Sequence, residues 1–250
     1  MGAFIEYRDI WKSFGEKEVL RGVDLEVRTG ENMVILGGSG TGKSVLLKIT
    51  IGLMIPDGGR LLVDDSDVTA LREEDWLPLR KRISYMFQWG ALFDSMTVFE
   101  NIAFPLRERR EFDEERISES VLEKLRLVDM EGSQGLFPAD LSGGMRKRVA
   151  LARSIIMEPE CILYDEPTAG LDPITADTIN RLIRRMQRVL GITSIVVTHD
   201  IQSMFAVGDR VSFLCEGRME FVGTPEEARR SDHKLLRGFI EGRNPDEQDS

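Results

Sequence analysis

The sequence predicts an α/β fold with a mostly parallel sheet at its core, and three apolar runs carry this prediction. They span residues 33–36, 161–164 and 194–197. Strands that are apolar on both faces are typical of sheets covered by helices on both sides, as in parallel strands joined by helical crossovers. Each run also ends at conspicuous polar residues. Because the carboxyl ends of parallel strands meet at one sheet edge, these residues are expected to form one site.

An antiparallel β part is predicted near the N-terminus and a hairpin near the C-terminus. Residues 23–28 alternate apolar and polar side chains, which is typical of a half-exposed strand, and residues 4–7 resemble them. Toward the end of the chain, runs at 211–214 and 219–222 flank a turn that contains Gly217.

A helical subdomain is predicted to be inserted into the α/β core at about residues 89–141. This segment lacks comparable strand runs, and Ile117, Val121 and Leu125 recur at the four-residue spacing of an amphipathic helix. Residues 1–241 are therefore expected to form a single domain that includes this inserted helical subdomain. Residues 242–250 have no apolar anchor and are expected to form a disordered tail.

The charge, the length of the apolar runs and the cysteine pattern limit which partners and which cellular compartment are expected. The 33 Lys and Arg against 43 Asp and Glu give a net charge of −10, which argues against nucleic acid as a partner. No apolar run reaches membrane-spanning length, and no signal or transit peptide is expected at the start. Cys161 and Cys215 lie in apolar runs without metal-ligand spacing, so both are interpreted as reduced core thiols.

A phosphate-binding loop follows the first apolar run. The pattern GxxxxGK[ST] matches eight consecutive residues, namely Gly37, Gly38, Ser39, Gly40, Thr41, Gly42, Lys43 and Ser44. In this pattern backbone amides wrap phosphate oxygens, the lysine reaches the outer phosphates and the hydroxyl binds Mg²⁺. The helix expected next adds its positive N-terminal end. The alternative, a glycine-rich turn with a coincidental lysine, does not account for a strand before the loop and a helix after it.

The other strand ends offer groups for hydrolysis. Asp165 and Glu166 follow the second run, where Asp165 would hold Mg²⁺ with Ser44 and Glu166 would polarise the attacking water. His199 follows the third run and is a candidate for contacting the γ-phosphate, although a lone histidine is more often a simple polar residue. Gln88 follows the strand-like residues 83–87, and its amide oxygen could reach Mg²⁺ or the water.

A second anion-binding helix start lies between these motifs. Ser142, Gly143 and Gly144 precede the helical run 146–157, with Ser142 as the expected N-cap. An ordinary capped helix would begin with the same residue types. However, this helix start lies between the phosphate loop and the carboxylate pair in the sequence, which favours a second phosphate cradle.

The order of these motifs resembles the ATP-binding subunits of ABC transporters over nearly the whole chain. The resemblance includes the phosphate loop, Gln88, the LSGG of residues 141–144, Asp165 with Glu166, residues 169–172 and His199. It implies ATP and Mg²⁺ as cofactors and a head-to-tail homodimer, in which the Ser142 cradle of one copy closes over ATP held by Lys43 of the other.

The same resemblance assigns two further residues. Asp172 would lie at the dimer seam. Phe14 aligns with the aromatic residue that stacks on adenine, with Trp11 or Tyr7 as alternatives and core packing possible for each.

A narrower resemblance comes from residues 87–101 and 103–107, from Met145 in place of the usual glutamine, and from residues 172–175. These are similar to the Mla-type ATPases that serve MCE-protein phospholipid transporters of bacterial envelopes. The resemblance implies membrane permease subunits, MCE and small regulatory subunits as partners, and a peripheral location on the cytoplasmic side of the inner membrane. The aromatic segment 89–104 is expected to dock the membrane partner.

Three alternatives remain from the sequence. The cargo could instead be a lipoprotein or a small solute such as an amino acid. A non-transport ABC protein acting on ribosomes or DNA is disfavoured by the absence of a long heptad insertion or a strong basic patch. A nucleotide-gated binding module without turnover is disfavoured because Glu166 and His199 are both present.

Overall fold

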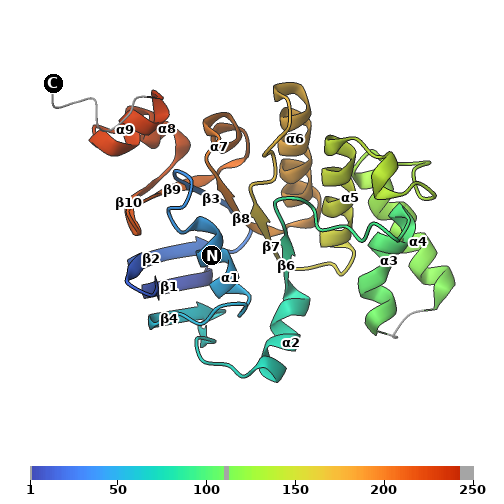
Figure 1. Ribbon diagram of the computed structural model, residues 1–250, viewed down its shortest axis with the longest axis horizontal. Helices are drawn as coiled ribbons and strands as arrows, with labels where there is room; N and C mark the ends of the chain where they lie inside the picture. The colour runs from blue at the N-terminus through green and yellow to red at the C-terminus, as the bar shows by residue number, and fades with distance from the viewer. Residues whose placement is uncertain (1, 110–112, 243–250) are drawn as a thin grey trace.

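The structure is a computed structural model that describes residues 2–109 and 113–242, so the expected tail lies outside it apart from Gly242. An antiparallel sheet occupies the N-terminal part, with strand order β2-β1-β4-β5 (Figure 1). Its strands are β1 (Ala3–Phe14), β2 (Lys17–Arg28), β4 (Gly58–Val63) and β5 (Ser66–Asp67). The alternation in residues 23–28 is confirmed, because inward-facing Val23, Leu25 and Val27 are buried while the residues between them are exposed.

A six-stranded sheet forms the core, with strand order β10-β9-β3-β8-β7-β6. Its strands are β3 (Asn32–Leu36), β6 (Ile83–Met86), β7 (Cys161–Asp165), β8 (Thr193–Thr198), β9 (Arg210–Cys215) and β10 (Arg218–Gly223). The five strands from β9 to β6 are parallel, and β10 pairs with β9 as an antiparallel hairpin. The predicted fold class is therefore confirmed. The carboxyl ends of β3, β7, β8 and β6 lie along one edge.

Helices and the second sheet cover both faces of this core. The helices are α1 (Lys43–Thr50), α2 (Glu73–Arg82), α6 (Pro173–Leu190), α7 (Ile201–Val207), α8 (Pro225–Arg230) and α9 (Lys234–Ile240). Alternate residues of β3 enter different clusters: Met33 and Ile35 pack toward α1 and the antiparallel sheet, whereas Val34 and Leu36 pack toward α6 and α7. Burial on both faces is the physical reason for the continuous apolar runs.

The two cysteines are both free, but only one is a core residue. Cys161 is buried, and Cys215 is half-buried at the end of β9. The expectation of two core thiols is thus wrong for Cys215, because β9 ends at this residue and the turn of the β9–β10 hairpin follows. Burial raises the pKa of both thiols.

A helical lobe lies at one end of the molecule (Figure 1). It contains α3 (Val98–Arg109), α4 (Glu114–Leu127), a short 3-10 helix (Pro138–Asp140) and α5 (Gly143–Ile155). Ile117, Val121 and Leu125 form the buried stripe of α4, as their spacing predicts. Because α5 packs against both α3 and α4, the helical packing continues past residue 141. In the described part of the chain, every helix is too short or too polar to span a bilayer.

Candidate active site

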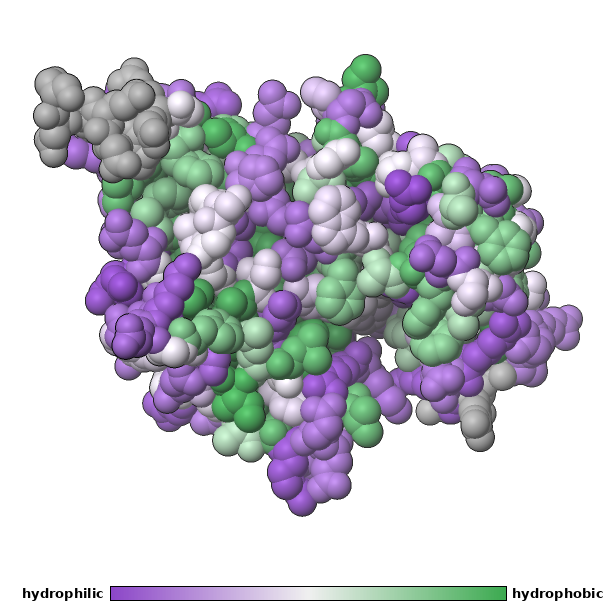
Figure 2. Space-filling model, viewed as in Figure 1, coloured by the Kyte–Doolittle hydropathy of each residue, from purple (hydrophilic) through white to green (hydrophobic). Residues whose placement is uncertain are grey.

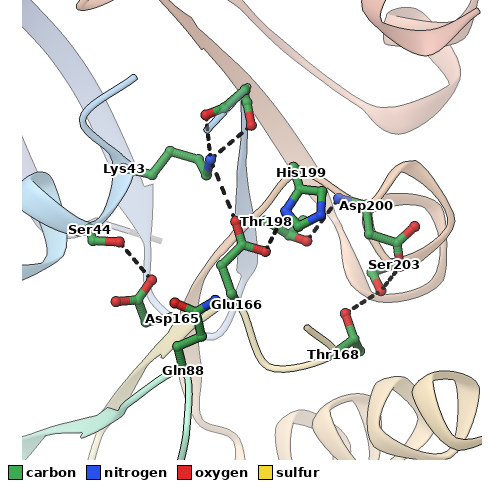
Figure 3. Close-up of polar contacts among 12 residues, drawn as sticks. Lys43, Ser44, Gln88, Asp165, Glu166, Thr168, Thr198, His199, Asp200 and Ser203 are labelled. Carbon is green, nitrogen blue, oxygen red and sulfur yellow. Dashed lines mark hydrogen bonds and ion pairs between the residues drawn. The ribbon is translucent and has the colours of Figure 1, made fainter. Parts of the chain in front are cut away.

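The expected phosphate loop joins β3 to α1 at the carboxyl edge of the sheet. A Cβ on Gly37 would lie 2.4 Å from the carbonyl oxygen of Leu214, and Gly42 has φ of 106° with its Cβ position 2.8 Å from Leu20 Cδ2. Both positions therefore require glycine. The loop curls around the Lys43 ammonium, whose Nζ donates to the carbonyls of Gly37 and Gly38 at 2.8 Å each (Figure 3).

The carboxylate pair at the end of β7 divides between two sets of partners. Asp165 Oδ1 accepts a hydrogen bond from Ser44 Oγ at 2.8 Å, and its Oδ2 accepts one from the Tyr85 hydroxyl at 2.7 Å. Glu166 Oε1 lies 3.5 Å from Lys43 Nζ, and Oε2 lies 3.0 Å from His199 Nδ1. The different surroundings agree with the expectation that the two carboxylates have different roles.

Glu166 has two features that mark a functional position. Its φ of 47° is in the left-handed region, which is uncommon for a residue with a side chain. Its side chain is largely buried, yet Oε2 receives no well-oriented hydrogen bond from the residues that the structure describes, since the approach of His199 lacks the right geometry. A buried carboxylate oxygen that still needs a donor is suited to accept one from a water molecule.

His199 lies on a short loop that several hydrogen bonds hold in place. The Asp200 backbone N–H donates to Thr198 Oγ1 at 3.0 Å, and Asp200 Oδ2 accepts from Ser203 Oγ at 2.6 Å. Ser203 Oγ lies 3.1 Å from Thr168 Oγ1, two residues after Glu166 (Figure 3). This network ties the histidine loop to the strand end that carries Glu166. The sequence analysis did not identify its hydroxyl members, because serine and threonine are common at helix starts.

Gln88 follows β6 and is half-buried, with its side chain beside those of Asp165 and Glu166 in Figure 3. Its backbone carbonyl accepts a hydrogen bond from Lys147 Nζ, which also donates to the Glu166 carbonyl at 3.2 Å. Lys147 is 5% exposed, and burial lowers its pKa to about 8. This lysine therefore joins α5 to two of the expected site residues.

Sequence reasoning missed Lys147 because it stands between Arg146 and Arg148 and looks like part of a solvated basic run. Helical periodicity is the signal that could have found it. Lys147 is three and four residues from Gly144 and Leu151, which are both buried on the inner face of α5.

The second expected cradle lies at the start of α5. Ser142 is its N-cap and its Oγ accepts from the Met145 backbone N–H at 3.2 Å. A Cβ on Gly144 would lie 2.4 Å from Thr175 Cγ2, so the starts of α5 and α6 are in close contact. Asp172 caps α6 by accepting from two backbone N–H groups at 3.1 Å each. The structure therefore brings the Ser142 cradle and Asp172 into one surface region.

The adenine-stacking candidates differ in exposure. Phe14 is 48% exposed at the end of β1, and Trp11 is half-buried with its Nε1 donating to Asp9. Tyr7 is 1% exposed and its hydroxyl contacts Thr50 at 2.6 Å, so the alternative that it stacks on adenine is wrong. Strand pairing explains this, because Tyr7 lies between Leu25 of β2 and Leu61 of β4.

The donor set also fits a magnesium ion accompanied by phosphates. Ser44 and Asp165 place a hydroxyl and a carboxylate together, and Gln88 adds an amide nearby. Within the described ranges no group of three or more His, Cys, Asp or Glu could hold a metal. Magnesium needs no such cage, since it is usually bound by one or two carboxylates with substrate phosphates and water.

Comparison with known proteins identifies the family of this chain. The family model described as ABC transporter matches residues 20–169. The chain is 40% identical over 243 residues to the probable ribonucleotide transport ATP-binding protein mkl of Mycobacterium leprae (strain TN), covering 97% of this chain and 70% of that protein. It is 35% identical over 238 residues to the intermembrane phospholipid transport system ATP-binding protein MlaF of Escherichia coli (strain K12), covering 95% and 88%.

A solved structure gives the same result for the fold. The dimeric post-hydrolysis state of the ATP-binding cassette MJ0796, bound to ADP and Pi, has a TM-score of 0.81 and 31% identity, covering 88% of this chain and 98% of that one. The chain matches the family model, shares the fold of a solved ATP-binding cassette, and brings its phosphate loop, carboxylate pair and histidine together in one site. It therefore belongs to the ABC transporter family and is an ATP-hydrolysing subunit.

Proposed function

We propose that this subunit drives phospholipid transport between or across bacterial envelope membranes, through a separate permease. The catalytic part of the proposal rests on one observation, the placing of the Glu166 carboxylate between Lys43 and His199. The cargo is supported by the likeness to MlaF and by the resemblance of residues 87–101 and 103–107 to Mla-type ATPases. Ribonucleotide cargo is the second candidate, because the name of the mycobacterial relative states it.

In the proposed hydrolysis, Glu166 is the general base. Its Oε2 accepts a hydrogen bond from the attacking water and takes up the proton as the water oxygen bonds to the γ-phosphorus. The bond from that phosphorus to the bridging oxygen of the β-phosphate breaks, and ADP and inorganic phosphate leave. His199, 3.0 Å from the same oxygen, orients the water and contacts the γ-phosphate. Lys43 exchanges its loop carbonyls for outer phosphate oxygens. Ser44, Asp165 and Gln88 would hold Mg²⁺, which when bound neutralises charge on the phosphates.

The second cradle completes the site in a dimer. The exposed Ser142 at the start of α5 would close over ATP held by Lys43 of a second copy, with Asp172 at the seam. The contact between the starts of α5 and α6 supports this arrangement, because it holds the two seam elements together. Phe14 is the proposed adenine platform.

A groove between the core and the helical lobe is the proposed permease site. It has a volume of about 550 Å³ and its walls include Phe87, Phe93 and Phe104. Figure 2 shows it as a hollow between α2 and α3 with hydrophobic surface on parts of its walls. Asn101 shapes one wall, since its buried side chain bonds Phe93 at both backbone groups. Docking there would place the subunit on the cytoplasmic face of the inner membrane, with MCE and small regulatory subunits as further partners.

Reconstitution tests this proposal. The chain is assembled with the permease that co-purifies with it, and ATP-dependent transfer of labelled phospholipid between liposomes is measured. We expect transfer that stops in the Glu166→Gln variant. ATP-dependent movement of a labelled ribonucleotide without lipid transfer would support the second candidate. Co-purification with ribosomes or DNA instead of membrane chains would contradict both.

A further inference from the structure

Tyr85 on β6 reaches the carboxylate that is proposed to hold Mg²⁺. In the parallel pairing of β6 with β7, Tyr85 lies opposite Leu163. Side chains two residues apart on a strand share a face, so Tyr85, Leu163 and Asp165 are on the same side of the sheet. The phenol ring extends along this face toward the carboxyl end of β7. Its hydroxyl donates to Asp165 Oδ2 at 2.7 Å.

The two oxygens of Asp165 are thereby held by donors from two different elements. Ser44 Oγ of α1 donates to Oδ1 at 2.8 Å, and the Tyr85 hydroxyl of β6 donates to Oδ2. Two donors on separate oxygens fix both the position and the plane of a carboxylate. Asp165 is 7% exposed, so little solvent is available to replace either bond.

We propose that Tyr85 is a positioning residue for the metal–nucleotide site, because its hydroxyl holds the Asp165 carboxylate in the orientation in which Oδ1 faces Ser44, the residue that would hold Mg²⁺ together with Asp165. The proposal rests on the magnesium role given to Asp165 under the proposed function. Partners that orient a metal-binding group commonly change metal affinity by 10-fold to 100-fold when removed. Here the effect should lie near the lower end, since Ser44 still holds the other oxygen.

The test removes one hydroxyl and keeps the ring. Tyr85→Phe preserves the contact with Phe87, whose ring centroid lies 4.4 Å away, and preserves the groove wall. Tyr164→Phe is the matched control. It also loses a buried phenol hydroxyl, one residue before Asp165, but this hydroxyl faces Met186 Sδ at 3.7 Å on the opposite side of the sheet. Denaturant unfolding of all variants shows whether stability has changed.

Two binding measurements on the full chain supply the readout. The first is Mn²⁺ affinity in the presence of ATP, followed by electron paramagnetic resonance, and the second is ATP affinity in EDTA. For Tyr85→Phe we expect Mn²⁺ affinity to fall by about 10-fold while ATP affinity in EDTA is unchanged, because the Lys43 loop does not depend on Tyr85. Tyr164→Phe should match the wild type in both.

Asp165→Asn separates failure of this proposal from failure of the proposed function. If Asp165→Asn weakens Mn²⁺ binding and Tyr85→Phe does not, the positioning role of Tyr85 is overturned while the role of Asp165 stands. If Asp165→Asn has no effect, both are overturned. Equal losses in Tyr85→Phe and Tyr164→Phe would indicate a general packing effect and reject the proposal. In the double variant, Tyr85→Phe should add little to Asp165→Asn, since the two act as a unit.

Discussion

Oε1 of Glu166 lies 3.5 Å from Nζ of Lys43, so the proposed general base and the proposed phosphate-binding lysine contact each other directly. Both side chains are largely buried. Burial lowers the pKa of Lys43, whereas the charge of Glu166 opposes this shift. The Glu166 carboxylate therefore favours the charged form of Lys43. Because Lys43 is proposed to bind phosphate and Glu166 to activate water, variants of the two residues should have distinguishable effects on binding and hydrolysis.

Replacing Lys43 by Ala should abolish most ATP hydrolysis while the fold is retained. The ammonium contacts loop carbonyls and Glu166 rather than the apolar core, so its loss removes charge from the phosphate site. Loss of a single strong donor to a reacting group typically costs about 10²-fold or more in rate. Phosphate release measures the effect, and circular dichroism checks the fold. Turnover near the wild-type rate would refute the phosphate-loop role.

Replacing Glu166 by Gln should separate binding from hydrolysis. The amide keeps the shape but removes the base and one negative charge that would face the γ-phosphate. ATP affinity should persist or increase, and the hydrolysis rate should fall by about 10²-fold to 10⁴-fold, as for a positioned base. Equilibrium binding and single-turnover hydrolysis measure the two effects. A parallel loss of both would contradict the assignment of Glu166.

The Glu166→Gln variant should also hold two copies together in ATP. Persisting ATP would bridge Lys43 of one copy and Ser142 of the other, and a ligand favours the state that binds it better. Crosslinking across the seam of the assembled complex measures closure. Adding Ser142→Arg should prevent closure without preventing ATP binding, because the bulk fills only the second cradle. ATP-independent crosslinking, or closure that tolerates Ser142→Arg, would reject the shared site.

Charge introduced into the groove should uncouple transport. Phe93 is 43% exposed, lines the groove and lies 5.0 Å from the Phe104 ring. Phe93→Asp should therefore reduce transport and permease-stimulated hydrolysis in the complex. Leu77→Asp is the matched control, because Leu77 is exposed on α2 but does not line the groove. Normal transport by the Phe93 variant would contradict permease docking there.

Trp89, the other aromatic residue expected to dock, occupies a different place. It is 76% exposed, does not line the groove, and its ring lies near Gly170 of the segment that leads to Asp172. If Trp89 acts at the seam, the effect of Trp89→Asp on transport and hydrolysis should therefore differ from the effect of Phe93→Asp. The assays of transport and permease-stimulated hydrolysis in the complex compare the two variants.

Lys147 should leave a signature in the pH dependence of stability. Its pKa is lowered to about 8 in the folded chain, against about 10.4 for an unfolded lysine. Between these pH values the unfolded chain binds more protons, so this residue makes the free energy of unfolding rise with pH. The stability of the wild type relative to Lys147→Met should therefore increase from pH 8 to pH 10. Denaturant unfolding of both proteins measures it, with exposed Lys17→Met as the control. A pH-independent difference would show that Lys147 does not titrate as described.

Sequence reasoning was most reliable where one strand or loop carries the signal. The runs that became β3, β7 and β8 are apolar because both faces are buried, so their pattern was sufficient. The sequence pattern predicted neither β5 nor α2. Strand β5 has only two residues, and α2 is highly charged, contains Pro78 and buries only Trp76. Neither element has enough apolar positions to show a period.

The sequence by itself determined the order and local chemistry of the motifs, since a phosphate loop or a capped helix depends on neighbouring residues. Only the tertiary structure decided which distant side chains meet. Tyr85 and Asp165 are 80 positions apart, and Lys147 joins α5 to the carbonyls of Gln88 and Glu166. Such contacts depend on strand order, on register and on which face of a helix is buried. The burial of Tyr7 was settled in the same way, by the pairing of β1 with strands on both sides.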